Sequence, residues 1–220
     1  MHHIIIDLEF NPVSYLNREK LGDEIIEIGA IKLDDECKEI SRYSRLIKPA
    51  LNERIMKKIT RLTGITTQMV ENESDFKAVM DDFVSWIGEG ETKLYSWSET
   101  DLIILKSECD YKNYDFPNAL SDWTDLQLLW HEKIELPISQ VFSLKSAAEF
   151  SNIEYKEEEA HRALYDSEVT ADLFKMIMDG SYKEVLKMKK FYITDEADYM
   201  TYSLADSSYG SLLASLLQSE

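Results

Sequence analysis

The sequence feature that most constrains this chain is "IIIDLEFN", in which three isoleucines lead into two carboxylates, Asp7 and Glu9. Alternate side chains of a β-strand point to the same face, so Asp7 and Glu9 would project together from an otherwise apolar strand. Two carboxylates placed in this way repel each other and lose hydration, which costs free energy unless a positive charge lies between them. The segment therefore predicts a buried strand, with a divalent cation as the simplest counterion.

Length and composition indicate one globular domain. The 220 residues suffice for one sizeable core and are too few for two comfortable domains, and the 44% hydrophobic content excludes a disordered chain. No apolar run is long enough to span a membrane, and the N-terminus has no secretory pattern. Cys37 and Cys109 lie far apart without metal-ligand spacing, so we expect reduced thiols and a cytoplasmic location.

Periodicity along the chain predicts an α/β domain. Strands are expected at residues 3–10, 23–33, 43–49 and 92–97. Helices are expected from residue 73 and at residues 98–109, 143–150 and 163–178, whereas residues 123–130 fit either a short strand or a helical turn. The first three strands are close enough in sequence for an antiparallel meander at the start of a mixed sheet. The order of elements predicts a three-layer domain, a mixed central sheet flanked by helices, over residues 1–180.

Residues 181–220 are expected to form a helical C-terminal extension. Residues 181–191 fit one helix, and a second amphipathic stripe consists of Tyr209, Leu212, Leu213, Leu216 and Leu217. This extension would either pack back on its own domain or offer a helix to a second subunit or a partner protein.

Three further residues complete a possible catalytic set: Asp101, His161 and Asp166. Hydrolysis of a phosphodiester can use two divalent ions about 3.5–4 Å apart, and Mg²⁺ and Mn²⁺ prefer carboxylate ligands. A histidine that titrates near neutral pH suits removal of the proton from the attacking water. Each residue alone has an ordinary alternative, because Asp101 could stabilise a helix start and His161 could be a surface histidine. Together they favour a nuclease.

The three patches resemble the motifs of the DEDDh 3′–5′ exonuclease family. The motifs are "IDLEFN", "YSWSETDLIIL" and "HRALYDSEVTADLF", and the resemblance covers about residues 3–178. The segments "EIIEIGAIKL" and "LTGIT" are similar to those of the subgroup that trims structured RNA ends. The resemblance implies a ribonuclease H-like fold and stepwise release of nucleoside 5′-monophosphates from a 3′ end.

The resemblance also assigns a role to each of the five residues. Asp7, Glu9 and Asp166 would hold one divalent cation, Mg²⁺ or Mn²⁺. Asp7 would bridge to a second cation, which Asp101 would support partly through water. His161 would be the general base, on a loop that enters the helix carrying Asp166.

The same resemblance suggests contacts with the terminal nucleotide. Phe10 and Asn11 stand where many family members have small or hydroxyl residues, and Thr63 lies in "LTGIT". Phe10 would either stack on a base or sugar or belong to the core. Asn11 would either donate to the 3′ hydroxyl or cap the following loop.

The net charge of −18 argues against a large nucleic-acid interface, because an acidic surface repels polyanions. A local basic patch would be enough for an enzyme that holds only a few nucleotides. Lys57, Lys58 and Arg61 are the candidates, and the alternative is that they are solvated helix-surface charges. We therefore expect single-stranded 3′ ends of RNA or DNA as substrates, held by few contacts.

Two other functions compete with a metal-dependent 3′–5′ exonuclease. A non-catalytic interaction module on the same fold would suit the acidity and the extension, but it would have no need of all five residues. A hydrolase of other phosphate esters would not need the His-x₄-Asp motif. No motif in the chain decides between RNA and DNA.

Overall fold

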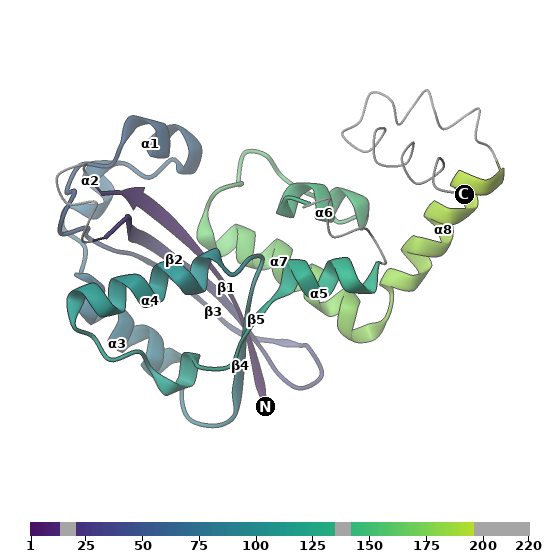
Figure 1. The fold of residues 1–220 in the computed structure, drawn as a ribbon, viewed down its shortest axis with the longest axis horizontal. Coiled ribbons are helices and arrows are strands. Elements are labelled where there is room, and N and C mark those ends of the chain that lie inside the picture. The colour runs from purple at the N-terminus through teal and green to yellow at the C-terminus, as the bar shows by residue number, and fades with distance from the viewer. Residues whose placement is uncertain (14–20, 135–141, 196–220) are drawn as a thin grey trace.

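A mixed five-stranded sheet forms the middle layer of the described residues (Figure 1), with the strand order β3-β2-β1-β4-β5. This computed structural model describes residues 1–13, 21–134 and 142–195, with side chains to residue 188. The strands are β1 (His2–Pro12), β2 (Asp23–Leu33), β3 (Glu39–Leu46), β4 (Thr92–Ser96) and β5 (Trp123–Asp125). β1 to β3 form the predicted antiparallel meander, whereas β4 pairs in parallel with both β1 and β5.

Helices cover both faces of the sheet, so the predicted three-layer architecture is confirmed (Figure 1). The helices are α1 (Lys57–Thr63), α2 (Thr67–Val70), α3 (Phe76–Ile87), α4 (Thr100–Lys112), the 3₁₀-helix η2 (Asn118–Leu120), α5 (Leu126–Lys133), α6 (Leu144–Phe150), α7 (Ala163–Asp179) and α8 (Tyr182–Asp195). Of the two largest cores in the described residues, one lies between the sheet and α3 and α4, and the other lies between the sheet and α5, α6 and α7.

β1 contributes to both cores because its side chains alternate between them. Ile4, Ile6 and Leu8 belong to the core under α3 and α4, and Ile5 belongs to the core under α7. The alternation carries Asp7 and Glu9 onto the α7 side of the sheet. The apolar strand therefore delivers two carboxylates to the place where α7 packs on β1 and β2.

Some local expectations were resolved only by the structure. Residues 123–130 contain both predicted alternatives in succession, since β5 ends at Asp125 and α5 begins at Leu126. The residue before α4 is Glu99 without a side-chain cap, although Ser98 Oγ accepts a hydrogen bond from the Thr100 N–H at 3.3 Å. Cys37 and Cys109 are both free, as expected.

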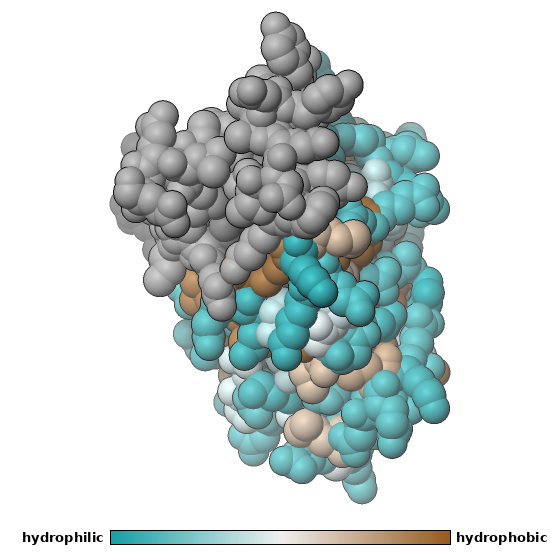
Figure 2. Space-filling view, turned by 90° about the vertical axis from the view of Figure 1, so that its right-hand side faces the viewer, coloured by the Kyte–Doolittle hydropathy of each residue, from teal (hydrophilic) through white to brown (hydrophobic). Residues whose placement is uncertain are grey.

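The segment predicted to be a C-terminal extension lies only partly within the described residues. α8 confirms a helix after Gly180, while residues 196–220, with the predicted stripe from Tyr209 to Leu217, lie outside the described residues. No helix in the described part of the chain is long and apolar enough to cross a membrane. The described surface in Figure 2 is mainly hydrophilic, in keeping with the charge of −18.

Candidate active site

Asp101 is fixed beside β1 by a backbone hydrogen bond. The parallel pairing of β1 with β4 extends from His2 to Ile5. Further along β1, beyond this pairing, the Leu8 N–H donates to Asp101 Oδ1 at 3.1 Å, so the Asp101 carboxylate accepts a hydrogen bond from the backbone of β1 where β4 no longer pairs with it. Asp101 can do this because it lies in the first turn of α4, which begins shortly after β4 ends. The helix start thus brings the second motif to the first.

His161 and Asp166 lie at the start of α7, which packs on the opposite face of the sheet from α4. The ligand atoms of Glu9, His161 and Asp166 all lie within 4.8 Å of one another, an arrangement suited to holding a metal ion. The His161 N–H donates to Asp166 Oδ2 at 3.2 Å, while Asp166 Oδ1 is buried with no hydrogen-bond partner among the described residues. A buried, unpartnered carboxylate oxygen is costly unless a ligand such as a cation satisfies it.

The electrostatics of the four carboxylates also fit divalent cations. Burial, and then the charges of Asp166, Glu27 and Asp101, raise the pKa of Glu9 to about 9. Burial is the main cause of the raised pKa of Asp101, about 7, and of Asp166, about 6. The pKa of Asp7 is also raised, by burial and then by Asp101 before the other carboxylates. Bound cations would offset this repulsion and hold the groups ionised.

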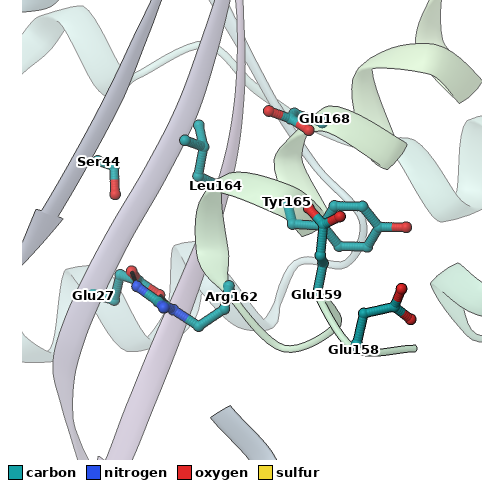
Figure 3. A pocket seen from close by; sticks show the side chains of 8 residues that line it. All are labelled: Glu27, Ser44, Glu158, Glu159, Arg162, Leu164, Tyr165 and Glu168. Carbon is teal, nitrogen blue, oxygen red and sulfur yellow. Dashed lines mark hydrogen bonds and ion pairs between the residues drawn. The ribbon is translucent and has the colours of Figure 1, made fainter. Parts of the chain in front are cut away.

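Residues that the motifs did not single out hold α7 in place. Gly29 of β2 lets the helix lie directly on the strand, since a Cβ built on Gly29 would stand 2.1 Å from the backbone of Ala163 and Leu164. Ser167 Oγ donates to the Gly29 carbonyl at 2.9 Å. Glu27, also on β2, lies against Arg162 (Figure 3) and accepts two hydrogen bonds from its guanidinium. The sequence signal for this support was a glutamate and a glycine inside an apolar strand.

Asn11 and Phe10 face different surroundings at the end of β1. The Asn11 side chain is fully buried, donates to the carbonyls of Asn52 and Arg54 at 3.2 Å and accepts from the Met56 N–H at 3.0 Å. These bonds tie Asn11 to the segment at residues 52–56, which is neither of the two roles expected for it, since they do not reach the loop that directly follows Asn11. Phe10 is partly buried against the core under α3 and α4, which favours its core role.

The remaining candidates for substrate binding lie on α1. Lys57, Lys58 and Arg61 are exposed there, next to the segment that Asn11 anchors to the end of β1. Thr63 is buried, and its hydroxyl donates to the Ile59 carbonyl and accepts from the Ile65 N–H, both at 3.0 Å. Both bonds of the Thr63 hydroxyl are made at the C-terminal end of α1, so this side chain is occupied there. The three basic side chains are accessible to solvent.

Comparisons with known proteins agree with this geometry. The family profile described as Exonuclease (RNase T) matches residues 4–174. The chain is 28% identical over 200 residues to the 3′-5′ exonuclease DinG of Bacillus subtilis (strain 168), covering 87% of this chain and 20% of DinG. It is 25% identical over 195 residues to the DNA polymerase III subunit epsilon of Aquifex aeolicus (strain VF5), covering 85% of this chain and 89% of that subunit. The chain thus spans about a fifth of DinG but most of the epsilon subunit.

A solved structure supports the fold. The nuclease domain of 3′hExo, a DEDDh family member bound to rAMP, has a TM-score of 0.72 and 22% identity, covering 81% of this chain and 92% of that domain. The family match includes the strand, the helix start and the histidine turn described above. The predicted resemblance is therefore confirmed: the chain belongs to the exonuclease family, with the ribonuclease H-like fold of its DEDDh members.

Proposed function

We propose that this chain is a metal-dependent 3′–5′ exonuclease that releases nucleoside 5′-monophosphates from the 3′ end of RNA or DNA. The observation that carries the proposal is the convergence of Glu9, His161 and Asp166 within 4.8 Å, with Asp101 bound to the same strand. Membership of the exonuclease family supports it. The rAMP bound to the 3′hExo domain is a nucleoside monophosphate of the kind expected as product.

The residues divide between holding cations and moving a proton. Asp7, Glu9 and Asp166 would hold one divalent cation, Mg²⁺ or Mn²⁺, and Asp7 with Asp101 would hold a second. When bound, such cations stabilise charge on the attacking and leaving oxygens of a phosphodiester. The exposed imidazole of His161 lies next to Glu9 and Asp166, so it can accept a proton from the attacking water and pass it to solvent.

The substrate is proposed to be a short single-stranded 3′ end. Opposing charge limits a long interface, since the whole chain carries −18. Lys57, Lys58 and Arg61 form an accessible basic surface on α1 that would contact the backbone of the last few nucleotides. A cytoplasmic location is part of the proposal. So is the division into a nuclease domain of residues 1–180 and a helical extension of residues 181–220, which would serve its own domain, a second copy or a partner.

The proposal is tested with matched RNA and DNA single strands, each labelled at the 5′ end in one set and at the 3′ terminal nucleotide in another. We expect early release of labelled mononucleotide from the 3′ label and a shortening ladder from the 5′ label. Activity should disappear with EDTA and return with Mg²⁺ or Mn²⁺. Asp7→Asn, which retains the shape of the side chain, should remain folded and inactive. Internal cleavage products, or full activity in EDTA, would contradict the proposal.

A further inference from the structure

Glu27 makes an ion pair next to the candidate active site. Its side chain is 1% exposed, and its two oxygens accept from Arg162 Nη2 at 2.6 Å and from Arg162 Nε at 3.1 Å. The oxygen bonded to Nε also accepts from the Ala163 N–H at 3.0 Å. A buried carboxylate with a two-pronged guanidinium partner and a backbone donor has a defined orientation.

The Glu27 carboxylate connects the two parts of the candidate active site, the one on β1 and the one at the start of α7. Glu27 of β2 lies directly opposite Glu9 of β1 in the antiparallel register. Its partners are the two residues that follow His161, and Ala163 is the first residue of α7. The strand that carries Glu9 is therefore linked, through its neighbour, to the turn that carries His161.

The turn at His161 needs such support. The backbone φ of His161 is 60°, in the left-handed region that residues other than glycine seldom adopt. A backbone in this region persists where surrounding interactions hold it. Within the turn, the His161 N–H bonds to Asp166, and outside the turn Glu27 holds the next two residues.

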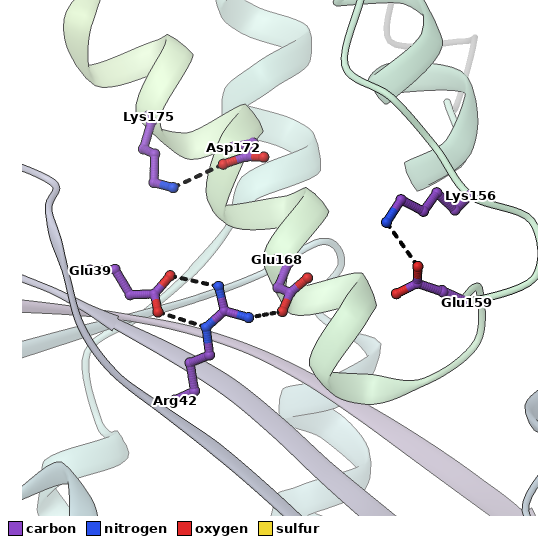
Figure 4. Close-up of polar contacts among 7 residues, drawn as sticks. All are labelled: Glu39, Arg42, Lys156, Glu159, Glu168, Asp172 and Lys175. Atoms are coloured by element: carbon purple, nitrogen blue, oxygen red, sulfur yellow. Dashed lines mark hydrogen bonds and ion pairs between the residues drawn. The ribbon is translucent and has the colours of Figure 1, made fainter.

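We propose that Glu27 and Arg162 are positioning residues, whose ion pair holds His161 and Asp166 at the correct distance from Glu9. This inference rests on the proposed exonuclease function. It differs from general anchoring of α7, because the sheet and this helix are also joined further along by Arg42, which pairs with Glu39 of β3 and with Glu168 of α7 (Figure 4). Arg42 is exposed, and among the described residues its guanidinium bonds to Glu39 and Glu168 and not to the His161 turn.

Four variants separate the contributions. Arg162→Met keeps the apolar part of the side chain and removes the guanidinium with its two hydrogen bonds. The position tolerates this change because the Arg162 side chain is 41% exposed. Arg162→Lys keeps a positive charge but cannot make the bidentate contact of the guanidinium. Glu27→Gln keeps an acceptor for the Ala163 N–H but not the ion pair. Arg42→Met is the matched control, since it breaks an ion pair between the sheet and α7 away from the turn.

The first measurement is steady-state hydrolysis of a short single strand at saturating Mn²⁺. We expect kcat of Arg162→Met and Glu27→Gln to fall about 10- to 100-fold, the usual effect of removing support from a metal-site residue. KM should stay within about twofold, because neither residue is proposed to bind substrate. Arg162→Lys should recover only part of kcat. Arg42→Met should stay within about twofold of the wild type, as expected for an exposed ion pair.

The second measurement uses the metal-free protein and does not depend on activity. Hydrogen exchange in EDTA should show lost protection in peptides around residues 160–166 of Arg162→Met, with unchanged protection in the later turns of α7. If Arg162→Met and Glu27→Gln both keep the wild-type kcat, the positioning role is wrong. It is also wrong if the whole of α7 loses protection equally in Arg162→Met. An inactive wild-type protein with intact protection would instead refute the proposed exonuclease function.

Discussion

Replacing Gly29 with alanine should displace the start of α7 from the sheet. The added Cβ would stand 2.1 Å from Ala163 C and Leu164 N, whereas ordinary contact begins at 3.4 Å, so the two backbones must separate by about 1.3 Å. The neighbours are backbone atoms of a helix, which cannot rotate away as a side chain can. Overpacking of this kind destabilises a fold by about 1–3 kcal/mol.

The effect on activity should be larger than the effect on stability implies. The displaced turn carries His161 and Asp166, and a misplacement of about 1 Å can reduce a catalytic rate by about 10²-fold. Thermal denaturation and steady-state exonuclease assays, run at a temperature where the variant remains folded, measure both effects. Gly22→Ala is the control, since no described atom lies within 4 Å of its added Cβ. Wild-type stability and kcat for Gly29→Ala would show that α7 does not depend on this close approach.

Three further perturbations test the charges of the site. His161→Asn, which tolerates the left-handed backbone, should reduce kcat about 10²- to 10⁴-fold while calorimetry shows that Mn²⁺ still binds. Burial and neighbouring carboxylates raise the pKa of Glu9 to about 9 and of Asp101 to about 7, so the metal-free native state keeps protons that the unfolded chain releases. The free energy of unfolding in EDTA should therefore fall as the pH rises from about 5 to about 9, and Mg²⁺ or Glu9→Gln should flatten this slope. Lys57→Glu with Lys58→Glu should raise KM without lowering kcat, and the wild-type salt dependence should match only about two to four single-strand contacts.

Each of these expectations has a contradicting result. Near-wild-type turnover of His161→Asn across neutral pH would move the general base to another residue. A metal-free protein that becomes more stable between about pH 5 and pH 9, with the same slope in Glu9→Gln, would mean that the carboxylates of the site are not held protonated. A steep salt dependence, or an unchanged KM after both lysine reversals, would place the nucleic-acid contacts elsewhere on the surface.

The sequence predicted the parts of the site that depend on local pattern. Strand alternation places Asp7 and Glu9 on one face, and the helix starts near Asp101 and Asp166 were visible from periodicity, which reflects only neighbouring residues. The resemblance of three motifs was specific enough to predict the family. The assignment of residues 123–130 remained open because a three-residue strand and the first turns of a helix share apolar residues at similar spacing.

Tertiary structure decided how these parts meet. The order of the sheet, with β4 parallel to β1 and shorter than it, leaves the Leu8 N–H for Asp101, and no local pattern contains that pairing. The hydrogen bonds of the Asn11 side chain likewise depend on residues 52–56, a segment far from it in the sequence. The ion pair of Glu27 joins residues 135 positions apart in sequence. The sequence alone determined the chemistry of the groups and their local directions, whereas long-range packing decided the distances between them, because those distances depend on contacts that only the whole fold brings together.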